Sequence, residues 1–173
     1  MASLLQDPLD VGQLAAQRTQ LEREFPIDAF DRVRSSLARP QGQAVAHFRF
    51  HVAGNYPALE GAVRAKAWLV CQRCLQEFEA TVESPVRVAF VARDAEASRV
   101  PDEYDAVTAP DGRLELLDFV EDELLLALPL VPMHPTTDEC TGRRPLPVAE
   151  PLRVVSNSGV TKPFAGLGDL FKR

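Results

Sequence analysis

The middle of the chain alternates between apolar and polar residues, and this pattern predicts β-strands. Residues 44–52, 61–71 and 77–90 each place apolar side chains at every second position. A period of two puts those side chains on one face of a sheet. The turn-forming sequence at 54–57 separates the first two runs, so we expect them to pair as a hairpin. Pro85 keeps the parity of the third run, which predicts a bulge or an edge position there.

The N-terminal part of the chain favours helices. Apolar residues recur at spacings of three and four from Val11 to Phe25, with Asp10 as a candidate N-cap and Pro26 as the end. A similar stripe predicts a second helix over residues 28–37. We therefore expect two helices before the first strand.

A later helix is predicted over residues 117–128. Its apolar stripe ends at Pro129, and Asp118 and Glu121 have the spacing of an N-cap and its capping-box partner. The preceding residues 93–112 are acidic and interrupted by prolines, without a periodic pattern, and are typical of a long mobile loop.

These elements predict an α+β fold with one domain over residues 1–140. It would contain N-terminal helices, an antiparallel sheet of about four strands and one late helix packed on that sheet. Residues 141–173 are rich in proline and predict a flexible tail. Residues 163–173 (PFAGLGDLFKR) are more apolar, end with basic residues and predict a short docking element.

Charge and hydropathy narrow the functional classes. The 173 residues carry a net charge of −6, and residues 93–140 hold 13 acidic and three basic side chains. This balance argues against a protein that coats nucleic acid or anionic membranes without selectivity. The longest apolar run, 124–133, contains two prolines and is too short to span a bilayer. The first ten residues lack the features of a secretion signal, so we expect a cytoplasmic protein without membrane contact.

The most specific local motif is Cys71-Gln72-Arg73-Cys74, which follows the second strand. Two thiolates at this spacing can bind one zinc ion, and His134 and Cys140 are the remaining candidate ligands. The alternatives are that the thiols are ordinary structural residues or that they are a redox pair. A redox pair is the weakest of these because the residues after Cys74 read as a strand rather than a helix. The hypothesis is a Cys₃His zinc site.

The polar side of the predicted hairpin mixes cations with an aromatic ring. Such a surface can bind RNA loops by stacking and phosphate contacts. The alternative is that the tryptophan lies in the core and the cations form an ordinary solvated face. The candidate RNA-binding residues are His47, Arg49, His51, Arg64, Lys66, Trp68 and Arg73.

Four features together resemble the bacterial large ribosomal RNA subunit accumulation protein family, YceD. They are CQRC at 71–74, VEDELLLALPLVPMH at 120–134, Cys140, and PFAGLGDLFKR at 163–173. The resemblance implies a cytoplasmic factor without enzymatic activity that is needed for accumulation of 23S rRNA, in its processing or in large-subunit assembly. It also implies that some relatives carry a further cysteine pair after the helix, where this chain has only His134 and Cys140.

Two functional hypotheses follow, and neither is an enzyme because no nucleophile motif or phosphate-binding loop occurs in the chain. In the first, the protein binds 23S rRNA or its precursor through the basic hairpin face and the basic C-terminal tail. In the second, it is an adaptor whose acidic helix and loop bind a ribosomal protein or an RNA-processing enzyme.

Overall fold

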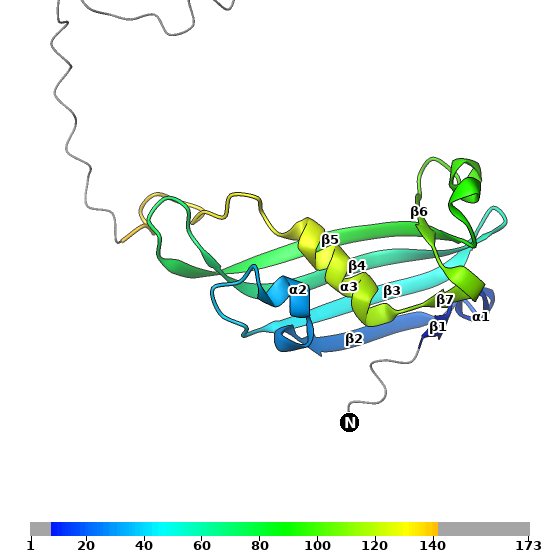
Figure 1. Ribbon diagram of the computed structural model, residues 1–173, viewed down its shortest axis with the longest axis horizontal. Helices are drawn as coiled ribbons and strands as arrows, with labels where there is room; N and C mark the ends of the chain where they lie inside the picture. Colours follow the sequence, from blue (N-terminus) through cyan, green and yellow to red (C-terminus); the bar gives the residue numbers. More distant parts are fainter. Residues whose placement is uncertain (1–7, 142–173) are drawn as a thin grey trace, which may run out of the picture. The chain divides into compact units, whose positions relative to one another are not determined.

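The computed structural model describes residues 8–141, and a five-stranded sheet forms its largest part (Figure 1). The strand order is β2-β3-β4-β5-β6. The strands are β2 (Gln20–Pro26), β3 (Gln43–Ala53), β4 (Tyr56–Val70), β5 (Glu77–Val91) and β6 (Asp105–Thr108). A second, two-stranded sheet pairs β1 (Leu9–Asp10) with β7 (Arg113–Leu114). The α+β class is therefore right, but the expected count of about four strands is too low.

The predicted meander is confirmed in β3, β4 and β5. These strands pair antiparallel over their length, and Gly54 has the positive φ of 60° that the tight turn between β3 and β4 requires. Pro85 stands directly opposite Ala62 in an uninterrupted register. It therefore occupies an edge position rather than a bulge, because a proline has no N–H to donate to a neighbouring strand.

The N-terminal helix is shorter than predicted. Asp10 is its N-cap, as expected, and accepts a hydrogen bond from the Gln13 N–H at 2.8 Å, but α1 covers only Val11–Ala16. Arg18 then adopts a left-handed φ of 51°, and the next residues form β2. The prediction of a helix up to Phe25 is wrong because pairing with β3 decides the conformation of this segment.

The second predicted helix is broken into two short pieces. A 3₁₀ turn, η2, spans Ile27–Ala29, and α2 spans Asp31–Arg34. The prediction is confirmed only in part, since the apolar stripe of this segment is buried by two separate turns.

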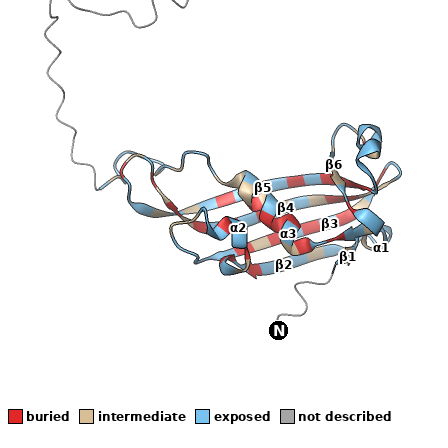
Figure 2. Cartoon of the chain, viewed as in Figure 1, coloured by how far each residue is buried: buried red, intermediate tan, exposed pale blue. Residues whose placement is uncertain are grey.

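The late helix is confirmed as α3, Leu116–Ala127. It lies across the inner face of the sheet, where its buried residues meet those of β3, β4 and β5 (Figures 1 and 2). The rings of Phe48 and Phe119 are 5.9 Å apart at this contact. Burial of this apolar surface is the main force that holds the helix on the sheet.

The predicted capping box of this helix is wrong. Its N-cap is Glu115, which makes no side-chain cap bond. Glu121 is buried and instead binds α2: its carboxylate accepts hydrogen bonds from the N–H groups of Arg32 and Val33 and from Arg32 Nε. The residue therefore joins the two helices rather than capping its own.

The segment expected to be a mobile loop contains regular structure. It holds the 3₁₀ helices η3 (Asp94–Arg99) and η4 (Pro110–Gly112), with β6 between them. β6 pairs parallel to residues 88–91 of β5, so the sheet is mixed and not purely antiparallel. A four-residue strand without alternation cannot be recognised from its sequence, because its position depends on the open edge of β5.

No helix among residues 8–141 has both the length and the apolar character needed to cross a bilayer. The predicted flexible tail and docking element, from residue 142 onward, lie outside the described residues.

Candidate functional site

The Cys-x-x-Cys motif forms a tight turn that directs both thiols inward. It connects β4 to β5, and its ends are joined by a 2.9 Å hydrogen bond from the Cys71 N–H to the Gln76 carbonyl. Leu75 completes the turn with a left-handed φ of 62° and donates its N–H to the Cys71 carbonyl. The Cys71 and Cys74 side chains are both buried, which sets them toward a common interior point.

The segment after α3 crosses back to this turn and brings the other two candidate ligands. The Gln72 N–H donates a 2.8 Å hydrogen bond to the Pro132 carbonyl. Two residues later, the His134 ring packs against the Phe78 ring with centroids 4.6 Å apart. Residues that are 56 and 60 positions apart in sequence are thereby placed side by side.

Three separations between the four donor atoms are close to those of a tetrahedral metal site. Nδ1 of His134 lies 3.5 Å from the Cys74 sulfur and 3.6 Å from the Cys140 sulfur, and the Cys71 and Cys140 sulfurs are 4.0 Å apart. All four donor atoms lie within 4.8 Å of one another. A tetrahedral zinc ion sets S···S edges of about 3.8 Å and S···N edges of about 3.6 Å. The predicted Cys₃His ligand set is therefore assembled, and its chemistry fits zinc.

Hydrogen bonds favour the thiolate form of Cys71, but not that of Cys74. Burial acts to raise the pKa of Cys71, but N–H groups of His134, Cys74 and Arg73 lower it to about 5. Burial raises the pKa of Cys74, and the neighbouring sulfurs raise it further. A cation placed among these sulfurs would relieve that repulsion, because metal ligation requires deprotonated thiols.

Arg73, a candidate RNA contact, lies within this cluster. Its Nε donates to the Cys140 sulfur at 3.1 Å, and Nη2 donates to the carbonyls of His134 and Thr136. The guanidinium therefore links the cysteine turn to the segment after α3.

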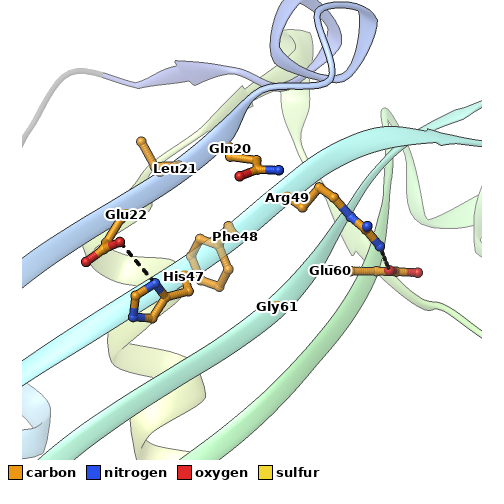
Figure 3. A pocket seen from close by; sticks show the side chains of 8 residues that line it. All are labelled: Gln20, Leu21, Glu22, His47, Phe48, Arg49, Glu60 and Gly61. Atoms are coloured by element: carbon orange, nitrogen blue, oxygen red, sulfur yellow. Dashed lines mark hydrogen bonds and ion pairs between the residues drawn. The ribbon is translucent and has the colours of Figure 1, made fainter.

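The other candidate RNA-binding residues do share the outer face of the β3–β4 hairpin, as predicted. The register places Arg64 opposite Val45 and Ala62 opposite His47 on this face. Figure 3 shows the shallow pocket on the same face where β2, β3 and β4 meet, beside Gly61. This pocket contains an ion pair between Arg49 and Glu60, and Nδ1 of His47 lies 3.4 Å from the Glu22 carboxylate.

Glutamates accompany most of these cations. Arg64 forms a 3.0 Å ion pair with Glu83 on β5, and Glu60 lies near both Arg49 and Arg87. Lys66 is exposed and has no ion-pair partner among residues 8–141. The basic positions expected from the sequence are therefore largely neutralised by acids from the neighbouring strands.

Trp68 is half-buried. It is neither a fully buried core residue nor a fully exposed surface for base stacking. The Arg39 guanidinium covers one face of its ring at 4.7 Å and also pairs with Glu77. His51 is half-buried as well, and its Nε2 lies 2.9 Å from the Tyr104 hydroxyl, which donates to Glu60. Both rings are thus partly covered by groups that are distant in the sequence.

Sequence comparison identifies the family. Residues 59–171 match the family described as large ribosomal RNA subunit accumulation protein YceD. The chain belongs to the YceD family. It is 30% identical, over 137 residues, to the large ribosomal RNA subunit accumulation protein YceD of Haemophilus influenzae, covering 77% of this chain and 78% of that protein. No solved structure matches the chain.

The region matched to the YceD family includes all four candidate ligands and both strands that border the cysteine turn. It excludes β2 and also β3, the strand that carries His47, Arg49 and His51. The family match thus covers the metal cluster completely and the candidate RNA-binding face only in part. Sequence reasoning missed the paired acids Glu60 and Glu83, although their positions follow from the hairpin register once the turns are placed.

Proposed function

We propose that this YceD-family protein is a factor without enzymatic activity that supports accumulation of the large-subunit (23S) rRNA or its precursor in the cytoplasm. Membership of the family, over residues 59–171, is the observation that carries this proposal. The described residues add a metal-type cluster and a charged outer sheet face, which are features of a binding protein.

We further propose that the Cys₃His cluster binds a structural zinc ion. The donor separations and the fourfold protein ligation support this role, because catalytic zinc sites keep an open coordination position. When bound, zinc would fasten the turn between β4 and β5 to the segment after α3. That segment lacks helix and strand over residues 128–141, so the ligands would supply much of what holds it.

Direct rRNA binding is proposed for the outer face of the hairpin. Lys66 and the half-buried Trp68 support it, since a cation without an ion-pair partner among residues 8–141, on the same strand face as an aromatic ring, can contact a phosphate while the ring stacks on a base. The neighbouring glutamates limit this contact to a small area.

Charge reversal at Lys66 tests the RNA-binding proposal. We expect Lys66→Glu to weaken binding to a 23S precursor fragment and to lower the slope of log K against log salt by about one, as one phosphate contact is lost. Filter binding at several salt concentrations gives both quantities. Arg34→Glu on α2 is the control, because this exposed cation lies away from the hairpin. Equal effects of the two changes would reject the hairpin face.

Protein docking is the second candidate function. It is favoured because glutamates on the outer face pair with most of the arginines there and leave little positive charge for RNA. We expect crosslinking in cells to recover a basic ribosomal protein or an RNA-processing enzyme, together with large-subunit precursors. Deletion should lower the ratio of 23S to 16S rRNA, and the wild-type protein should restore it. An unchanged ratio in the deletion strain would reject the role in rRNA accumulation, whatever is crosslinked.

A further inference from the structure

One edge of the large sheet is open along most of β5. β6 pairs only with residues 88–91, so residues 77–87 of β5 have no neighbour on that side among residues 8–141. Figure 1 shows β5 at the border of the sheet, with β6 beside one end only. An open edge of this length presents unpaired backbone groups that can bind another extended chain.

The register identifies which backbone groups point outward. The Cys71 N–H bonds to the Gln76 carbonyl, which marks these two residues as a hydrogen-bonded antiparallel pair. Such pairs alternate with pairs whose N–H and C=O groups point away from the partner strand. Glu77, Glu79, Thr81 and Glu83 therefore direct their N–H and C=O groups toward the open side, and Pro85 follows the same parity.

Side chains give this edge two different faces. On the outer face, Glu77, Glu79 and Glu83 are exposed. On the other side, a groove of about 560 Å³ runs between this part of β5 and the segment after α3. Val131 and Met133 line the groove and are 58% and 50% exposed, which is high for large apolar residues.

The negative charge along this edge indicates which kind of molecule can bind there. The lining contains no lysine or arginine, and Glu79 has no ion-pair partner among residues 8–141. A phosphate backbone would be repelled by Glu79, whereas Glu77 and Glu83 are already paired with Arg39 and Arg64. A second copy of the chain, paired antiparallel about Thr81, would place Glu79 opposite Glu83, which is also repulsive. An extended protein segment with basic side chains would not experience either of these electrostatic repulsions.

We propose that the open edge of β5, residues 77–85, binds an extended, basic protein segment by strand addition. Backbone bonds to the edge would supply affinity, while alternating basic and apolar side chains would meet the glutamates and the Val131–Met133 side of the groove. This inference rests on the proposed docking function and names the chemistry of its partner.

Peptide binding to the full-length protein tests the site. The probe is a fluorescent eight-residue peptide of alternating lysine and valine, and a glutamate–valine peptide is its charge control. We expect Glu79→Lys to weaken lysine–valine binding at least tenfold. Thr81→Pro should abolish binding because it removes an N–H that points away from β4. The pairing of β5 with β4 should survive, since Pro85 is already accommodated at a position of the same parity.

Glu24→Lys is the matched control variant. This exposed glutamate lies on β2 at the opposite border of the sheet, so its reversal changes the net charge equally. Its binding should stay within twofold of wild type. Equal weakening by Glu24→Lys and Glu79→Lys, or tight binding of the glutamate–valine peptide, would overturn the proposal, as would undiminished binding by folded Thr81→Pro.

Amide exchange in the wild-type protein gives a readout that does not depend on a variant folding. Added lysine–valine peptide should slow exchange at the amides of Glu79, Thr81 and Glu83, and unchanged exchange at saturation would overturn the edge site. If the protein restores 23S rRNA in the deletion strain but does not bind the peptide, only the proposed binding site at the β5 edge is rejected. Normal peptide binding by a protein whose deletion leaves rRNA unchanged rejects the proposed function alone.

Discussion

Purified protein is expected to contain about one zinc ion per chain, and Cys74→Ser is expected to remove it. The physical reason is that the four donor atoms already lie within 4.8 Å of one another, and three of their separations, 3.5–4.0 Å, are close to the edges of a tetrahedral site. Replacing one thiolate by a hydroxyl removes a strong ligand, and the remaining three cannot enclose the ion. Elemental analysis after gel filtration measures the metal content directly.

Loss of zinc should also lower stability. Zinc binding at a thousandfold excess over its dissociation constant stabilises the native state by about 4 kcal/mol. In a chain of this size, that corresponds to a fall in Tm of roughly 10 °C for Cys74→Ser or for the chelated wild-type protein. Calorimetry with and without a chelator measures this shift, and zinc added back to the chelated wild type should reverse it.

Two further measurements test the zinc proposal: the absorption of the cobalt-substituted protein, and the zinc content of a control variant next to Cys140. Co(II) in the wild-type protein should give the visible absorption of a tetrahedral site with thiolate ligands. Glu139→Gln is the control, since this exposed residue precedes Cys140 and bonds Thr136 rather than the cluster. Zinc retained by Cys74→Ser, or absent from wild-type protein prepared without chelator, would contradict the proposal.

Glu121→Ala is expected to lower the free energy of unfolding by about 2–3 kcal/mol. The variant leaves the N–H groups of Arg32 and Val33 without their acceptor, and the bond to Val33 is buried. Asp122→Ala is a closely matched control, because Asp122 binds the same arginine from a side chain that is 59% exposed. Its cost should stay below about 1 kcal/mol. Urea unfolding of both variants measures the difference, and equal costs would contradict the role given to Glu121.

The contribution of Glu121 should depend on pH. Burial acts to raise its pKa, but hydrogen bonds from Arg32 and Val33 outweigh this and lower the pKa below the ordinary carboxyl value. A carboxyl with a lowered folded-state pKa stabilises the protein above its unfolded pKa, and this stability is lost as pH falls through the folded value. The stability gap between wild type and Glu121→Gln should therefore be constant near neutral pH and shrink below about pH 4.

The meander and the late helix could be predicted because their signals are local and strong. The alternating pattern of β3 to β5 extends over many residues, and the turns between them join neighbouring segments. The helical reading of residues 20–25 failed for the opposite reason. Leu21 and Phe25 fit a spacing of four as well as a period of two, and only hydrogen bonds to β3 separate these alternatives.

The candidate site divides in the same way. The Cys71–Cys74 pair can be recognised as half of a metal site from its spacing alone, and His134 and Cys140 are the remaining candidate ligands by elimination. Their convergence depends on α3, which crosses the sheet and returns the chain to the cysteine turn. The net charge of the outer face likewise could not be predicted from the residues of one strand, because Glu83 on β5 pairs with Arg64 on β4.

The sequence by itself determined the α+β class, the central hairpins, the late helix, the cysteine pair and, through its resemblance, the YceD family. These properties depend on residue spacing and composition, which a linear chain carries. Only the tertiary structure decided the strand identity of β2 and β6, the closure of the Cys₃His cluster, the cross-link made by Glu121 and the open edge of β5. Each of these depends on which distant segments meet, and that is set by the burial of a shared core and the pairing of backbone groups rather than by any local pattern.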